Sequence, residues 1–197
     1  MAATMRMAAP LWHGTNPALL SAGASRVGEL LKLQGGTIAC FEATTGGLIN
    51  ASLQAVPGAS RYYRGGSNVY GKEGYAIYPD HLRDLLLEHR AAHGSGYETE
   101  IAYWDSKVAM TRLIAREMRR HVGTEWCLAE SGATGPTFLP ADCSSGFTAI
   151  AIAGPDPEQD HVALVVSDHG EREKNMWQFT ASSLALMAEA LERHASP

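Results

Sequence analysis

Hydrophobic positions along the chain switch repeatedly between helical and extended spacing, and this alternation predicts a layered α/β domain. The helices that we expect run from Asn16-Pro17 to Gly35-Gly36, from the turn after Phe41 to about Ala55, over Asp80–Ala92, from an Asp105 cap to about His121, and from about Asn175 to His194. The expected strands are Thr37–Phe41, Ser67–Tyr70, Trp126–Ala129, Phe147–Ala153 and Val162–Val166. The last two strands flank the turn Gly154-Pro155-Asp156-Pro157, which favours an antiparallel pair. We therefore predict one three-layer α/β/α domain with a mixed sheet over residues 17–197, preceded by an N-terminal arm, residues 1–16.

Composition narrows the classes of function. A chain of 197 residues with 45% hydrophobic residues can bury the core of one domain. Its net charge of −5 argues against nucleic-acid binding, and no apolar run has the length of a membrane span. Three cysteines at unrelated spacings argue for a reducing compartment, so we expect an intracellular protein, most simply a cytoplasmic one. The first 26 residues contain no Asp or Glu, a composition also seen in transit peptides, so organelle targeting stays open.

The segment with the most chemical content is Phe41-Glu42-Ala43-Thr44-Thr45-Gly46-Gly47. It follows an apolar run and precedes Leu48–Leu53, an arrangement of strand, tight turn and helix start. Such a turn exposes backbone N–H groups to an anion. Thr45 is in place to cap the helix, and Glu42 either orients a ligand or holds the turn through local backbone N–H groups.

Five segments together resemble the C-terminal domain of the CinA family. The turn is similar to the family's A-E-S-C-T-G-G signature. The other four are Pro57-Gly58-Ala59-Ser60, Gly65-Gly66-Ser67-Asn68-Val69-Tyr70, Ser131-Gly132-Ala133-Thr134-Gly135-Pro136 with the following Ser145-Gly146-Phe147-Thr148, and Gly170-Glu171-Arg172. The resemblance implies the family's α/β fold, a homodimer, and an amidohydrolase that converts nicotinamide mononucleotide to nicotinate mononucleotide and ammonia.

The departures from the family pattern fall on the catalytic residues. The resemblance implies a Ser/Lys dyad in which a neutral lysine takes the proton of the nucleophilic serine. Ala43 stands at the serine position and Tyr75 at the lysine position, whereas the family's site tyrosine is present as Tyr70. We therefore expect a catalytically silent relative that binds a nucleotide-like ligand or another protein.

Two other hypotheses stay open. The chain is an active amidase with a rearranged site, in which Thr44 is the nucleophile and Lys72 or Tyr70 the base. Alternatively, it is a structural subunit whose pocket is filled, because five tyrosines crowd this region: Tyr62, Tyr63, Tyr70, Tyr75 and Tyr78. Release of ammonia would distinguish an active amidase from a binding protein. Calorimetry with nicotinamide mononucleotide distinguishes a binding protein, which gives heat, from a structural subunit, which gives none.

The residues expected to contact a ligand of the nicotinamide mononucleotide type are Glu42, Thr44, Thr45, Gly46, Gly47, Ser131, Gly132 and Arg172. We expect no cofactor and no metal, since His89 and His93 share a helix face without further ligands nearby. Residues 94–104 look like an insertion relative to the family. Tyr103 and Trp104 in it are candidates for a contact with a protein partner.

Overall fold

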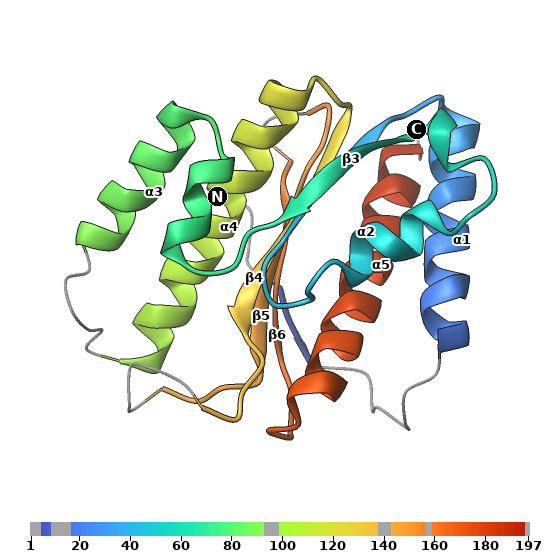
Figure 1. Ribbon diagram of the computed structural model, residues 1–197. Coiled ribbons are helices and arrows are strands. Elements are labelled where there is room, and N and C mark those ends of the chain that lie inside the picture. Colours follow the sequence, from blue (N-terminus) through green and yellow to red (C-terminus); the bar gives the residue numbers. More distant parts are fainter. Residues whose placement is uncertain (1–4, 9–16, 93–98, 138–142, 157–158, 196–197) are drawn as a thin grey trace.

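One mixed sheet of six strands organises the chain (Figure 1). The computed structural model describes residues 5–8, 17–92, 99–137, 143–156 and 159–195. The strands are β1 (Met5–Ala8), β2 (Ile38–Glu42), β3 (Tyr63–Asn68), β4 (Trp126–Ala133), β5 (Phe147–Ala153) and β6 (His161–Val166), in the spatial order β1-β6-β5-β4-β2-β3. β2 pairs in parallel with β3 and β4, and β1 in parallel with β6. β5 is antiparallel to both β4 and β6, so the sheet is mixed as expected.

Helices cover both faces of the sheet, which confirms the predicted three layers. One face carries α1 (Pro17–Gln34), α2 (Leu48–Gln54) and α5 (Arg172–Ala195), and α1 packs along α5 (Figure 1). The other face carries α3 (Asp80–Ala92) and α4 (Glu100–Val122). Every residue of β5 is buried, as expected for a strand with helices above and below it.

Each helical layer has its own apolar core. Leu31, Ile150 and Phe179 are buried between the sheet and the layer of α1, α2 and α5. Leu82 and Ile114 are buried on the opposite face, under α3 and α4. None of the helices that the structure describes is long and apolar enough to span a membrane.

Most predicted elements are confirmed, and three boundaries are wrong. The helix Asp80–Ala92 and the strand Phe147–Ala153 have the predicted limits. α4 begins at Glu100 because Thr99 Oγ1 accepts a hydrogen bond from the backbone N–H of Ala102, so Asp105 lies inside the helix.

The other two wrong boundaries belong to strands. β3 begins at Tyr63, so the glycine pair at 65–66 lies inside the strand and does not precede it. β4 continues to Ala133, four residues beyond the predicted end at Ala129, because its pairing with β5 extends that far. In addition, β1 brings part of the expected arm into the sheet, whereas Asn16 lies outside the described residues.

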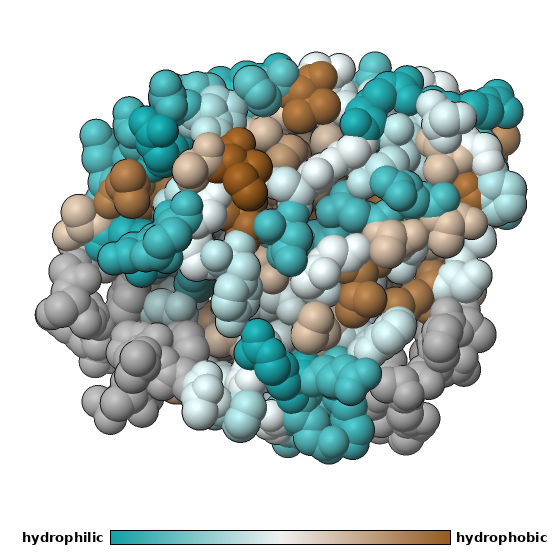
Figure 2. Space-filling view, viewed as in Figure 1, coloured by the Kyte–Doolittle hydropathy of each residue, from teal (hydrophilic) through white to brown (hydrophobic). Residues whose placement is uncertain are grey.

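The proposed aromatic contact surface in the 94–104 segment is wrong in part. Tyr103 is buried, and its ring packs edge-on against Phe147 at a centroid distance of 5.7 Å. Trp104 packs on the same ring at 5.9 Å. Tyr103 therefore belongs to the interior of the domain and Trp104 is half-buried beside it, while residues 93–98 lie outside the described part. On the face shown in Figure 2, apolar side chains are scattered among polar ones.

Candidate functional site

The turn between β2 and α2 has the predicted place in the fold. β2 ends at Glu42 and α2 begins at Leu48. Gly46 and Gly47 have φ angles of 68° and 97°, a left-handed conformation that favours glycine. A Cβ at Gly46 would also lie 2.7 Å from the Met176 methyl group. The two glycines are thus needed for the path of the chain.

Glu42 holds this turn, in agreement with the structural interpretation of that residue. Its carboxylate accepts hydrogen bonds from the backbone N–H groups of Gly47 (3.0 Å), Ile49 (3.1 Å) and Asn50 (2.7 Å). The Thr45 hydroxyl and the Asn50 amide also donate to it. Burial raises the pKa of Glu42, and these hydrogen bonds oppose the rise. The donors at the start of α2 are therefore occupied by a carboxylate of the protein itself.

A second buried carboxylate, Glu130 on β4, occupies the first half of the turn. Its Oε2 accepts hydrogen bonds from the backbone N–H groups of Ala43 (3.2 Å), Thr44 (3.0 Å) and Thr45 (3.1 Å). The hydroxyl groups of Thr44, Thr45 and Thr148 also donate to Glu130.

The expectation that the turn offers open N–H groups to an external anion is therefore wrong. Thr45 does not cap α2 either, because its one hydroxyl proton is shared between the carboxylates of Glu42 and Glu130. The helix N-cap is Gly47, which has no side chain to accept a hydrogen bond.

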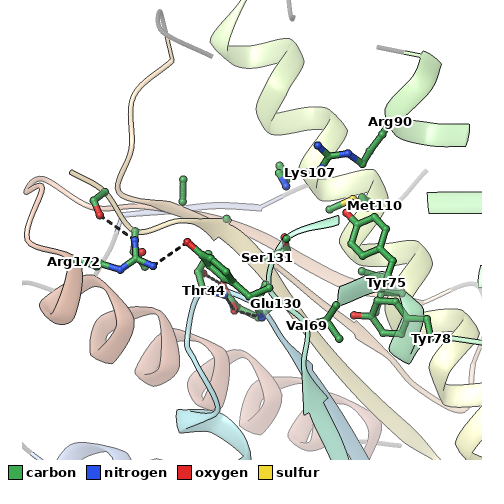
Figure 3. A pocket seen from close by; sticks show the side chains of 18 of the residues that line it. Thr44, Val69, Tyr75, Tyr78, Arg90, Lys107, Met110, Glu130, Ser131 and Arg172 are labelled. Carbon is green, nitrogen blue, oxygen red and sulfur yellow. Dashed lines mark hydrogen bonds between the residues drawn. The ribbon is translucent and has the colours of Figure 1, made fainter. Parts of the chain in front are cut away.

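A cavity of about 270 Å³ lies beside this turn, between the ends of the strands and the helices α3, α4 and α5 (Figure 3). It brings together seven of the residues singled out in the sequence: Ala43, Thr44, Tyr70, Tyr75, Ser131, Gly132 and Arg172. Three cations line it, namely Arg90 from α3, Lys107 from α4 and Arg172 from α5. Glu130 is the one carboxylate in the described lining, and its oxygens face the turn donors. The cavity thus favours an anionic guest.

The positions that correspond to the catalytic dyad lie in the cavity wall. Ala43 contributes a methyl group where the family pattern has a nucleophilic oxygen. Tyr75 is buried, and its hydroxyl donates to the sulfur of Met110 at 3.5 Å (Figure 3). Tyr75 packs against Tyr78 with a centroid distance of 6.2 Å. The replacement tyrosine is therefore part of the core as much as of the cavity.

Tyr70 and Arg172 form the rim on the side of α5. Arg172 Nη2 donates to the Tyr70 hydroxyl at 3.0 Å, and Nη1 donates to the carbonyl of Gly135 at 3.2 Å. Arg172 is the first residue of α5 and lies across the cavity from Arg90 and Lys107 in Figure 3. Tyr70 remains 63% exposed. Two of the five tyrosines lie elsewhere: the hydroxyl of Tyr62 donates to the carbonyl of Leu53 and that of Tyr63 to Asn50.

Two of the groups considered for a rearranged site, Thr44 and Lys72, do not lie together in the structure. Thr44 is buried and donates its hydroxyl proton to Glu130. The side chain of Lys72 is 63% exposed and lies 3.9 Å from the Glu73 carboxylate, outside the cavity lining. Lys72 is thus in no position to accept a proton from Thr44.

Ser131 and Gly132 lie in β4 and not in a loop. Ser131 is buried at the cavity wall. A Cβ on Gly132 would come within 2.1 Å of the Phe147 carbonyl oxygen, so glycine is required for the close approach of β4 and β5. The glycine that this segment shares with the family loop is therefore explained by packing.

Sequence reasoning missed three charged residues of the site, Glu130, Lys107 and Arg90. Glu130 follows Ala129, which pairs with Phe41 in the sheet, so it lies beside the turn once the strands are in register. The sequence signal that could have found Glu130 is its position directly before the Ser131 segment, which resembles the family. Lys107 lies on α4 one turn before Met110 and left no local motif. Among described residues no group of three metal-ligating side chains comes together, and His89 contacts the Ser106 hydroxyl and carbonyl.

Comparison with known sequences identifies related chains. The profile of the CinA C-terminal domain family matches residues 21–191. A CinA-like protein of Parasynechococcus marenigrum is 32% identical over 133 residues, which is 68% of this chain and 28% of the relative. A putative competence-damage inducible protein of Desulforamulus reducens is 35% identical over 129 residues, 66% of this chain and 28% of the relative. The matched region thus makes up less than a third of these relatives.

Solved structures show the same fold. A CinA superfamily protein from Klebsiella pneumoniae superposes with a TM-score of 0.70 at 20% identity, over 88% of this chain and 98% of the other. The competence/damage inducible protein CihA from Agrobacterium tumefaciens gives a TM-score of 0.65 at 21% identity, over 91% and 99%. At this level of identity the likeness concerns the fold alone.

Proposed function

The chain belongs to the CinA C-terminal domain family, and from that premise we propose that it binds a small anionic molecule of the nicotinamide mononucleotide type without hydrolysing it. The observation that carries the proposal is the cavity of about 270 Å³ with three cations on its wall and Ala43 at the position of the nucleophile. An open cavity beside Tyr75 also favours binding over a structural subunit with a filled pocket.

The absence of hydrolysis follows from the chemistry of the wall. The family reaction, as the resemblance implies it, needs a nucleophilic oxygen, a base and N–H donors for the oxyanion. Ala43 has no oxygen, and the Tyr75 hydroxyl donates to Met110. The N–H groups of residues 43–45 donate to Glu130. Removal of a nucleophile from a hydrolase typically costs on the order of a million-fold in turnover.

Calorimetry tests the binding. We expect the wild-type protein to bind nicotinamide mononucleotide at neutral pH, and the nucleoside without phosphate to bind about tenfold more weakly, since a charged hydrogen bond contributes roughly 1.5 kcal/mol. Arg172→Ala should weaken binding by a similar factor. Arg120→Ala is the matched control, because Arg120 pairs with Glu117 on α4 away from the cavity. Equal affinity for the nucleotide and the nucleoside would contradict an anion site.

Ammonia release tests the absence of hydrolysis. The alternative, an active amidase, is favoured by one observation, the hydrogen bond from the Thr44 hydroxyl to the Glu130 carboxylate. Against it, Thr44 is buried, and the three backbone N–H groups of the turn already donate to Glu130, so none of them is left to stabilise an oxyanion. We expect no turnover above background. Turnover that persists in Thr44→Ser and disappears in Thr44→Ala would establish the amidase instead.

The assembly and location follow as further parts of the proposal. We propose a homodimer, by analogy with the family, in a reducing intracellular compartment. The three cysteines are free and buried, which agrees with such a compartment. Sedimentation velocity at micromolar concentration tests the dimer. A partner protein at the 94–104 segment would have to engage residues other than the buried Tyr103.

A further inference from the structure

The amine of Lys107 is a potential nucleophile in the cavity that the proposed binding uses only as a charge. Lys107 projects from α4 toward the space bounded by Tyr75 and Arg90, whereas the family lysine position is held by Tyr75 (Figure 3). A primary amine therefore reaches this cavity from a different element of the fold.

The surroundings of Lys107 lower its pKa, so that more of the neutral amine is available than in an exposed lysine, although the charged form still predominates at neutral pH. On its own helix, its Nζ lies 5.6 Å from the centre of the Tyr103 ring, a contact that favours the charged form. Arg90 faces it from α3, Glu130 from β4, and Tyr75 and Tyr78 from the turn that precedes α3. Burial, and then the charge of Arg90, lower the pKa of Lys107 to about 8, while Glu130 acts in the opposite direction. Among the described residues, Lys107 forms no ion pair.

The other lysines have different environments. The chain contains four, at positions 32, 72, 107 and 174. Lys72 is largely exposed and Lys174 half-buried, and they lie 3.9 and 2.5 Å from the carboxylates of Glu73 and Glu171. Lys32 lies in the last turn of α1, on the other face of the sheet. Lys107 is the only one of the four in the cavity lining, so the chain carries its own internal controls.

We propose that Lys107 forms a reversible Schiff base with an anionic aldehyde or ketone whose charged group is held by the arginines of the same cavity. The inference rests on the proposed function, because it uses the cavity as an anion site. It adds a covalent step and a substrate class, a carbonyl compound that carries a carboxylate or phosphate.

The step balances without any further reactant. The lone pair of the neutral amine attacks the carbonyl carbon, and a C–N bond forms while the C=O π pair moves to oxygen. A proton passes from nitrogen to that oxygen and a second proton joins it from solvent; the nitrogen lone pair then forms the C=N bond as the C–O bond breaks with release of water. The nitrogen loses its remaining proton or keeps it as an iminium. Nothing is oxidised or reduced, and hydrolysis reverses the reaction.

Reductive trapping tests the inference on the wild-type protein. The full chain is incubated with glyoxylate and cyanoborohydride, and the carboxymethylated lysines are located by peptide mass spectrometry. We expect Lys107 to be labelled at least tenfold faster than Lys72 and Lys174. Its rate should fall by up to about tenfold for each pH unit below 8, as the neutral fraction falls. Acetaldehyde, a neutral probe of similar size, should show a smaller preference for Lys107 than glyoxylate, because it keeps the effect of the lowered pKa but lacks the attraction of the arginines.

The outcomes separate the two proposals. Labelling of Lys107 no faster than Lys72 overturns the Schiff-base inference, whether or not nicotinamide mononucleotide binds. Selective labelling by glyoxylate in a protein that binds no nucleotide supports the inference and contradicts the proposed ligand type. Equal selectivity for glyoxylate and acetaldehyde overturns the role of the arginines. Lys107→Arg should abolish labelling at this position, and its far-UV circular dichroism reports whether it folds.

Discussion

Glu130→Ala is the sharpest perturbation of the site, because one side chain satisfies most of the turn. Its carboxylate accepts hydrogen bonds from three backbone N–H groups at 3.0–3.2 Å and from three hydroxyl groups. Rotation of the hydroxyl groups lets them find other acceptors, but the backbone N–H groups have fixed directions. The cost of the substitution is therefore set mainly by three orphaned donors.

The magnitude follows from the place of these donors. An unsatisfied buried N–H group costs about 1–3 kcal/mol, and the turn borders the cavity, where water can enter, so the lower end applies. Three donors then give a loss of about 3 kcal/mol in the free energy of unfolding. For a chain of this size the loss corresponds to a decrease in Tm of roughly 6–12 °C.

The variant should also gain a property that the wild type lacks. With the carboxylate removed, the N–H groups of residues 43–45 form an empty anion site next to a positively charged cavity. Inorganic phosphate at a hundred times its Kd should then restore about 2.7 kcal/mol, whereas the wild type should gain little at this turn. Urea unfolding followed by circular dichroism, with and without phosphate, measures both effects.

Glu125→Ala is the matched control, since this carboxylate accepts a hydrogen bond from the Thr37 N–H group (2.8 Å) at the surface, outside the cavity. We expect it to lose no more than about 1 kcal/mol and to show no extra stabilisation by phosphate. The reasoning is refuted if Glu130→Ala is as stable as Glu125→Ala. It is also refuted if phosphate stabilises both variants equally.

Three further predictions concern the cavity and the middle of α4. Ala43→Ser with Tyr75→Lys should give only slight ammonia release from nicotinamide mononucleotide, because the turn N–H groups remain bound to a carboxylate; turnover near that of an active family member would contradict this. Because folding lowers the pKa of Lys107 to about 8, the unfolded chain binds more protons than the folded chain at pH values above 8. The stability of the wild type relative to Lys107→Met should therefore rise between pH 8 and 10 in urea titrations, and parallel pH profiles would refute the assignment. Asp160→Asn should lose about 1–3 kcal/mol, because the buried carboxylate pairs with two half-exposed arginines of α4; a loss below 0.5 kcal/mol in thermal unfolding would show that these pairs are already solvated.

The architecture was predictable because apolar periodicity records which faces are buried. β5 reads as a continuous apolar run and is buried along its whole length. The wrong start of α4 has a local cause, since a threonine and an aspartate compete as helix caps, and only the observed hydrogen bond to Thr99 decides between them.

The chemistry of the turn was predictable only in part. The motif placed Glu42, Ala43 and the two glycines correctly at a junction of strand and helix. It could not show that a carboxylate almost ninety residues later would accept the N–H groups of the turn, because that contact depends on the register of β2 against β4. Lys107 was hidden for a similar reason, as a single lysine on an amphipathic helix resembles any solvent-facing one.

The position of Glu130 bears directly on why a nucleophile alone would not restore hydrolysis. Attack on an amide places a negative charge on the carbonyl oxygen, and backbone N–H groups normally stabilise that charge. Here those of residues 43–45 already stabilise a carboxylate. A second negative charge about 4 Å away would be disfavoured by roughly 4 kcal/mol at an effective dielectric constant of 20, about a thousandfold in rate. Conversion of Ala43 to serine therefore supplies the oxygen but leaves the transition state unsupported, and activity should require replacement of Glu130 as well.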